Sequence, residues 1–214
     1  MHETLCRLEQ IAVVPAIILN DADHVEPLAE ALIEGGLPCA EITLRTPASL
    51  EVLKRMEPYS DRLLLGAGTV LNISQADEAI DAGARFIVSP GMDEKLIRHC
   101  QDRNILIIPG ACTPTEVMMA VNLGLDCVKF FPSHAFGGLP VLRALHGPFP
   151  QMRFLPTGGI TMESLTDHLG FKPVLAVGGT WMIKPEWLEN GRYDLVTEVC
   201  TTTMEIVQGA RRMR

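Results

Sequence analysis

Polar residues alternate with apolar ones in the segment Ala40–Arg45, and they are of types that carry acid–base and anion chemistry. Glu41, Thr43 and Arg45 share one face of a strand, because successive side chains of a strand point to opposite faces. In a barrel the outer face packs on helices and is apolar, so these three residues are expected to point inward. A buried carboxylate and guanidinium are costly unless paired or functional. Two interpretations stay open: a catalytic acid/base beside an anion-binding arginine, or an internal ion pair that fixes register.

A second strand-like run, Cys127–Pro132, places a lysine among apolar neighbours. Lys129 shares its face with Cys127 and Phe131, so it loses hydration on burial. Loss of hydration favours the neutral amine, which is the form that attacks a carbonyl group to make a Schiff base. Lys129 is therefore the candidate nucleophile, and the alternative is a structural ion pair with Glu41.

The chain holds only four other lysines, and each lies where a solvated charge is expected. Lys54 and Lys95 fall in amphipathic helix-like segments. Lys172 lies in a turn before the last strand-like run, and Lys184 follows that run, just before Pro185. Only the last is kept as a reserve nucleophile. In chain order these lysines are Lys54, Lys95, Lys172 and Lys184.

Two strand-like runs end in Gly-Gly pairs with an adjacent threonine, at Thr157–Gly159 and Gly178–Thr180. In many barrels the loops after strands seven and eight bind phosphate through backbone N–H groups, which glycine leaves accessible. We therefore expect a phosphate subsite, and the alternative is two tight turns that need only flexible dihedrals. The ends of two earlier runs, 66–69 and 89–91, are expected at the same mouth, where the Thr69 hydroxyl could donate to a carboxylate.

Eight short apolar runs alternate with helix-like segments, and these elements must position the polar residues. The runs are too short for typical helices and most end at Gly, Pro, Ser or Thr, which predicts buried strands. Eight strands alternating with helices fit either a closed (β/α)₈ TIM barrel or an open doubly wound sheet. Even spacing and the absence of a GxGxxG turn after the first run favour the α/β barrel. The runs cover residues 13–19, 39–44, 63–70, 85–90, 105–110, 126–132, 153–159 and 174–179.

Residues 3–12 precede the first strand and predict an extra N-terminal helix over the bottom of the barrel. Ser74 and Thr113 are expected to cap helices, with Pro114 at a first helical position. No linker or change of composition divides the chain, so residues 1–214 are expected to form a single barrel domain.

Composition limits the classes of function. The 214-residue chain carries 18 Lys+Arg against 26 Asp+Glu and only two Trp and two Tyr, so nucleic acid is not an expected partner. No run reaches the ~18–20 apolar residues of a membrane span, and the first residues lack the regions of a signal peptide, which predicts a cytoplasmic protein without a membrane partner. No cysteine or histidine spacing predicts a metal site, and the six cysteines are expected to be reduced thiols.

Seven motifs occur in a fixed order from about residue 11 to past residue 184: EITLRT, GAGTV, SPG, IPG, KFFP, PTGG and VGG. Together they resemble the bacterial 2-keto-3-deoxy-6-phosphogluconate (KDPG) aldolase family. The resemblance implies a class I aldolase on a (β/α)₈ barrel, usually a homotrimer, that needs no metal or other cofactor. Such an enzyme cleaves KDPG to pyruvate and D-glyceraldehyde 3-phosphate. Many members also cleave 2-keto-4-hydroxyglutarate (KHG) to pyruvate and glyoxylate.

The resemblance also assigns roles to single residues. Lys129 in KFFP matches the Schiff-base lysine, and Glu41 in EITLRT matches the general acid/base. Arg45, with Thr69 beside it, matches the site of the substrate carboxylate. The other expected substrate-binding residues are the pocket walls Pro90 and Phe131 and the tail and phosphate positions Thr157, Gly158, Gly159, Gly178, Gly179 and Thr180.

The chain departs from the family near the expected phosphate. Thr180 stands where Ser is common, and KFFP is followed by Ser133–Phe136 where Ala-Glu is more usual. His134 and Phe136 are expected on the rim of the site, so the aldehyde specificity is less tightly predicted than the chemistry. Two alternatives therefore remain: an aldolase for the 6-phosphogalactonate epimer, which differs at C4, and a catalytically silent phosphosugar-binding barrel.

Overall fold

The computed structural model describes residues 2–212, and each of the eight predicted runs contains a strand. The strands are buried almost throughout, as strands covered by helices on their outer face must be. They are β1 Val13–Ile17, β2 Cys39–Thr43, β3 Leu64–Gly68, β4 Phe86–Val88, β5 Leu106–Ile108, β6 Cys127–Phe130, β7 Arg153–Pro156 and β8 Val177–Gly179.

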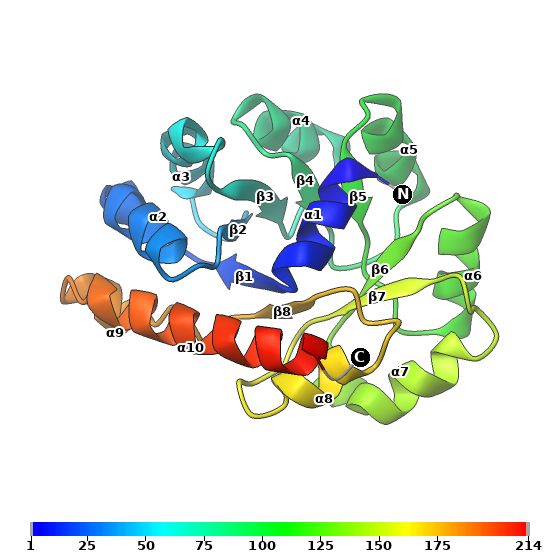
Figure 1. The fold of residues 1–214 in the computed structure, drawn as a ribbon. Helices are drawn as coiled ribbons and strands as arrows, with labels where there is room; N and C mark the ends of the chain where they lie inside the picture. Colours follow the sequence, from blue (N-terminus) through cyan, green and yellow to red (C-terminus); the bar gives the residue numbers. More distant parts are fainter. Residues whose placement is uncertain (1, 213–214) are drawn as a thin grey trace.

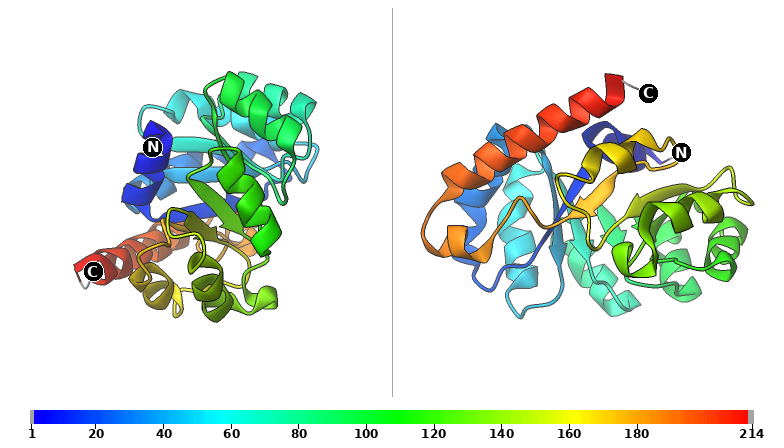
Figure 2. Two further views of the ribbon diagram at one scale, coloured as in Figure 1. Left: turned by 90° about the vertical axis from the view of Figure 1, so that its right-hand side faces the viewer. Right: turned by 90° about the horizontal axis from the view of Figure 1, so that it is seen from below.

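The strands follow one another around a barrel. Six of them form a curled parallel sheet in the order β5-β4-β3-β2-β1-β8, and β6 pairs with β7. Isolated parallel bridges join the two sheets at both edges, from Gly110 to Lys129 and from Thr157 to Gly178. Figures 1 and 2 show the strands inside a layer of helices. The prediction of a (β/α)₈ barrel rather than an open doubly wound sheet is therefore confirmed.

Helices follow the strands and cover the outside of the barrel (Figure 1). The last helix, α10, is 20 residues long and packs against α2 and α8. Three short 3₁₀ turns, η1 Ala22–His24, η2 Glu57–Tyr59 and η3 His134–Phe136, lie in the connections. The helices are α1 Glu3–Ile11, α2 Val25–Glu34, α3 Ser49–Met56, α4 Ile73–Asp81, α5 Glu94–Asp102, α6 Pro114–Asn122, α7 Gly138–His146, α8 Leu165–Gly170, α9 Pro185–Glu189 and α10 Tyr193–Arg212.

Helix α1 covers the end of the barrel at which the strands begin. It buries Leu5 and Leu8, and Leu5 shares a small cavity with Leu106 and Cys127, the first residues of β5 and β6. Its Glu9 forms an ion pair with Arg153, the first residue of β7. The predicted N-terminal helix over the barrel bottom is therefore confirmed, and it leaves the opposite end free for a site.

Helix starts were only partly predictable. Thr113 begins α6 as predicted, with a capping box to Glu116 and a proline at the first position. The prediction for Ser74 is wrong, because Asn72 caps α4 by accepting the Gln75 N–H at 2.9 Å. Asparagine caps as well as serine, and its position one residue before Ile73 fits the observed start of the helix.

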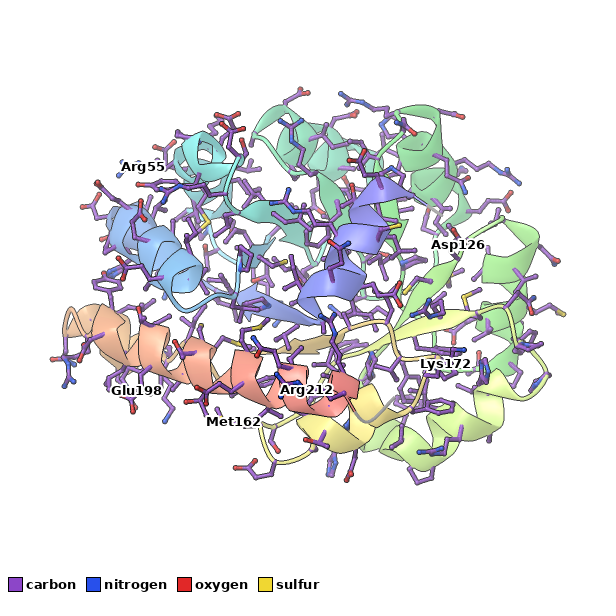
Figure 3. The ribbon with its side chains drawn as sticks, viewed as in Figure 1. Arg55, Asp126, Met162, Lys172, Glu198 and Arg212 are labelled. Atoms are coloured by element: carbon purple, nitrogen blue, oxygen red, sulfur yellow. The ribbon has the colours of Figure 1, made fainter. Side chains whose placement is uncertain are left out.

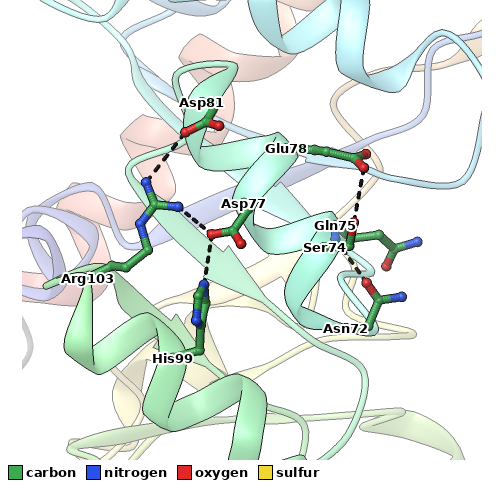
Figure 4. Close-up of polar contacts among 8 residues, drawn as sticks. All are labelled: Asn72, Ser74, Gln75, Asp77, Glu78, Asp81, His99 and Arg103. Carbon is green, nitrogen blue, oxygen red and sulfur yellow. Dashed lines mark hydrogen bonds and ion pairs between the residues drawn. The ribbon is translucent and has the colours of Figure 1, made fainter.

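A charged network links α4 and α5 on the outside of the barrel (Figure 4). His99 Nε2 lies 2.8 Å from Asp77 Oδ1, and Arg103 contacts both Asp77 and Asp81. The hydrogen bonds from His99 and Arg103 hold the pKa of Asp77 below its usual range. These groups lie outside the cavity described below, so we assign the network to helix packing.

The six cysteines are all free thiols, as predicted. Cys39, Cys100, Cys127 and Cys200 are buried, whereas Cys6 and Cys112 are half-buried. Desolvation raises the pKa of Cys100 to about 11 and the pKa of Cys200 to about 12. The buried thiols therefore behave as small apolar side chains rather than as nucleophiles.

Candidate active site

A cavity of about 200 Å³ opens at the carboxyl ends of β1, β2, β6, β7 and β8. Glu41, Thr43 and Arg45 line it, whereas Ala40 and Ile42 belong to the buried core outside it. The predicted two-faced strand is therefore confirmed. Figure 3 shows that other charges, such as Arg55, Lys172 and Glu198, lie on the outer surface of the molecule.

Glu41 and Lys129 meet inside the barrel, from strands that are not neighbours in the sheet. Their exposed fractions are 0% and 5%, and Lys129 Nζ lies 3.4 Å from Glu41 Oε1. The second carboxylate oxygen, Oε2, has no hydrogen-bond partner among the described residues. Lys129 Nζ also lies 5.2 Å from the ring centroid of Phe131. A buried pair at this distance lets the carboxylate exchange protons with the amine or with groups bound to it.

The arginine of β2 lies further out, at the mouth of the cavity. Arg45 is exposed, and its Nε donates to Thr69 Oγ1 at 2.9 Å. Among residues 2–212 it forms no ion pair with a carboxylate, so the rest of the guanidinium can bind an anion. Thr43 has a structural contact instead, since its hydroxyl donates to the Ile17 carbonyl at 2.9 Å.

Two predicted site residues stand outside the lining of the cavity. Thr69 reaches it only through Arg45. Pro90 is exposed at the end of β4, and its carbonyl oxygen abuts Gly110, where a Cβ would come within 2.1 Å. The structure therefore does not bring Pro90 into the cavity wall, whereas Phe131 does line it.

Residues of the loops after β7 and β8 line the cavity with free backbone N–H groups. Gly158 and Gly159 both have positive φ, 93° and 78°, a conformation that glycine adopts without strain. Among the described residues, the N–H groups of Gly158, Gly159, Ile160 and Thr180 donate to no protein acceptor. All four residues line the cavity. We call these four groups the N–H cradle; consecutive free N–H groups of this kind form an anion-binding concavity.

The second Gly-Gly pair is required by close packing. A Cβ at Gly178 would lie 2.3 Å from Thr157 Oγ1, and one at Gly179 would lie 1.8 Å from the Trp181 ring. Any larger residue would push Thr157 or Trp181 aside. Gly178 and Gly179 are therefore required by close packing against Thr157 and Trp181, and not only by the backbone dihedrals of a tight turn.

Three lining residues escaped prediction. Ala16 and Ile18 come from β1 and the segment after it, and Ile160 follows the first Gly-Gly pair. Ala16 pairs with Glu41 in the β1–β2 register, which residue spacing alone does not reveal. Ile160 contributes a backbone group, so its side-chain type carries no signal.

The two residues singled out on the rim differ in position. His134 is the first residue of η3 and Phe136 is the last, and both are exposed. The His134 side chain packs against Gly159, because a Cβ at Gly159 would lie 2.4 Å from His134 Cβ. Phe136 keeps 48% of its surface exposed, and neither residue lines the cavity.

Within residues 2–212, no group of three or more His, Cys, Asp and Glu side chains could hold a metal ion. The same residues include no helix long and apolar enough to cross a membrane. Among the residues that line the cavity, the ones with ionisable side chains are Glu41, Lys129 and Arg45.

The fold is a parallel β/α barrel, and its cavity holds a buried lysine–carboxylate pair, an arginine at the mouth and the N–H cradle. These features define a barrel aldolase of the Schiff-base class. The chain belongs to the KDPG and KHG aldolase family, whose model matches residues 5–199.

The relatives agree with this family. The KHG/KDPG aldolase of Escherichia coli is 41% identical over 199 residues, which cover 93% of this chain and 92% of the relative. The KDPG aldolase of Zymomonas mobilis, solved with 3-phosphoglycerate, has a TM-score of 0.87 and 37% identity over 95% of this chain and 96% of its own. The KDPG aldolase of Legionella pneumophila, with pyruvate captured as a covalent carbinolamine intermediate, has a TM-score of 0.86 and 38% identity over 90% and 93% of the two chains.

Proposed function

We propose that the protein is a class I aldolase that cleaves KDPG to pyruvate and D-glyceraldehyde 3-phosphate through a Schiff base on Lys129. The observation that carries the proposal is the buried pair of Lys129 Nζ and Glu41 Oε1, 3.4 Å apart in the cavity. The relative that was captured with pyruvate as a carbinolamine supports the same chemistry. A merely structural ion pair needs neither an open cavity beside it nor an unpartnered carboxylate oxygen.

The first half of the reaction makes the iminium ion. The neutral Lys129 amine attacks the C2 ketone and forms a carbinolamine, with a proton delivered to the former ketone oxygen. Glu41 shuttles protons as this hydroxyl leaves as water. Arg45 holds the C1 carboxylate at the mouth, beside the Thr69 hydroxyl, and such a clamp fixes C2 near the amine.

The second half breaks the C3–C4 bond. Glu41 takes the proton of the C4 hydroxyl while the bond electrons move onto C3 and the iminium, which gives an aldehyde and an enamine. The enamine is protonated at C3, and water then releases pyruvate and restores the lysine. The N–H cradle would hold the phosphate of the aldehyde half, near the Thr157 and Thr180 hydroxyls.

Borohydride reduction with pyruvate tests the nucleophile. Reduction should fix a pyruvyl group on the peptide that carries Lys129, detected by mass mapping, and Lys129→Arg should abolish the adduct. Lys184→Arg is the matched control, because Lys184 is the reserve lysine and its Nζ lies over the Trp187 ring at 4.8 Å. An adduct on Lys184, or none on the wild type, would rule out the assignment of Lys129.

A coupled assay of pyruvate release tests the substrate. We expect turnover of KDPG and also of KHG, since the relative from E. coli bears both names. Faster turnover of the 6-phosphogalactonate epimer would reassign the substrate to that alternative. Ligand-induced thermal stabilisation without pyruvate release would identify a silent phosphosugar-binding barrel instead.

We further propose that the chain is one barrel domain, acts in the cytoplasm and assembles as a homotrimer. The continuous cluster of buried side chains from α1 to α10 supports the single domain. The trimer rests on the family resemblance, and light scattering of the purified protein tests it: a mass near 70 kDa, about three times 23.4 kDa, is expected.

A further inference from the structure

The first strand supplies the cavity wall between the buried carboxylate and the N–H cradle. Ala16 of β1 lies beside Glu41, because the two residues pair in the β1–β2 register. On the other edge of β1, Pro15 pairs with Gly179 of β8, so Ala16 stands level with the next residue, Thr180. Ala16 therefore lies between the Glu41 carboxylate and Thr180, one of the cradle residues.

Ala16 faces the cavity and leaves space in it. It is half-buried, whereas the other four residues of β1 are buried. Ala16 and Ile18 both line the cavity, as alternate residues of a strand do, and Ile18 lies at the mouth with 46% of its surface exposed. Bulky branched side chains dominate the interior of such barrels, so an alanine at this inward position leaves room beside Glu41.

The backbone around Ala16 is held in place on both sides. Strand β1 pairs with β2 on one edge and with β8 on the other. Just beyond Ala16, the Thr43 hydroxyl donates to the Ile17 carbonyl at 2.9 Å. The Thr46 hydroxyl donates to the Leu19 carbonyl at 2.5 Å. Atoms added to the side chain at this position must therefore enter the cavity, whose volume is only about 200 Å³.

We propose that Ala16 is a specificity-determining residue that limits the size of the substrate tail which the site admits. The proposal rests on the proposed function, in which Glu41 acts at C4 and the phosphate lies at the cradle. The chain of atoms from C4 to the phosphate then crosses β1 at Ala16. A bulky residue at this position excludes the tail, whereas pyruvate has no tail and still reaches Lys129.

The test compares kcat/KM for pyruvate release from KDPG with the rate at which borohydride traps pyruvate on Lys129. Ala16→Leu and Ala16→Asn both place atoms beyond Cγ. Each should lower kcat/KM for KDPG about 10–200-fold, while the trapping rate stays close to that of the wild type. Because one added side chain is apolar and the other polar, a shared loss identifies size as the cause. Ala16→Val keeps its added methyl groups next to the strand and should retain most of the KDPG turnover.

Ala144→Leu is the matched control, because Ala144 is exposed on α7 and does not line the cavity. It should change neither rate. A loss of KDPG turnover in only one of Ala16→Leu and Ala16→Asn would overturn the proposal. An equal fall in KDPG turnover and pyruvate trapping would also overturn it, because Ala16 would then act through Glu41 or Lys129 and not on the tail. If the wild type releases no pyruvate from KDPG, the proposed function itself fails; if it does and both variants match it, only the role of Ala16 fails.

Discussion

Replacing Glu41 by glutamine separates the catalytic interpretation of the buried pair from the structural one. Glutamine has the same shape, and its amide oxygen can still accept from Lys129 Nζ at the observed 3.4 Å. The amide cannot take a proton, so acid–base help is lost while the site keeps its shape. Such help contributes about 10²–10⁴ in rate, or about 3–5 kcal/mol of transition-state stabilisation.

The assay is pyruvate release from KDPG, with borohydride trapping of pyruvate and thermal unfolding measured in parallel. We expect kcat to fall by about 10²–10⁴, while the lysine adduct still forms on long incubation, more slowly because Glu41 also assists dehydration of the carbinolamine. If the pair served only the fold, losing its charge would cost about 3–5 kcal/mol, which lowers Tm by about 6–20 °C in a chain of this size. Turnover within threefold of the wild type, with or without a fall in Tm, would refute the role of Glu41.

Two further predictions follow from packing. A Cβ at Gly68 would lie 2.1 Å from Glu41 Oε1, so Gly68→Ala should displace the carboxylate and lower kcat by about 10². Gly170→Ala is the control, because a Cβ there meets no atom within 4 Å, and it should leave kcat unchanged. Equal kcat values for the two variants would contradict the expectation for Gly68. A thiol reagent at pH 8 should label the half-buried Cys6 and Cys112 in the native protein and the four buried cysteines only after denaturation. Mass mapping of the labelled peptides identifies the labelled cysteines. Rapid labelling of a buried thiol in the native protein would contradict the expectation.

The barrel and its inward-facing residues were predictable because both depend on short-range periodicity. Alternation in 40–45 placed Glu41 and Arg45 on one face, and in 127–132 it placed Lys129 on the inner face. A barrel has only one interior, so inward residues of non-adjacent strands must meet there. The closed barrel therefore predicts that Glu41 and Lys129 lie close together, although the spacing of residues along the chain does not show it.

The rest depended on features that side-chain types do not encode. The cradle consists of backbone N–H groups, and one of them belongs to Ile160, an apolar residue with no signal for anion binding. The place of Ala16 beside Glu41 is set by register. The start of α4 at Asn72 rather than Ser74 was a choice between two good capping residues, which tertiary packing decides.

The proposed phosphate site at the cradle would let a chain with a net charge of −8 bind a doubly charged anion. Lysine and arginine side chains would carry full charges to the phosphate, but they are flexible and lose entropy when fixed. The N–H groups of Gly158, Gly159, Ile160 and Thr180 are already held by the backbone of the barrel loops, and their dipoles act at short range on a group bound in the cavity. The negative exterior is screened beyond about 8–10 Å at physiological salt. Anion binding at this site would thus depend on local geometry rather than on the net charge of the chain.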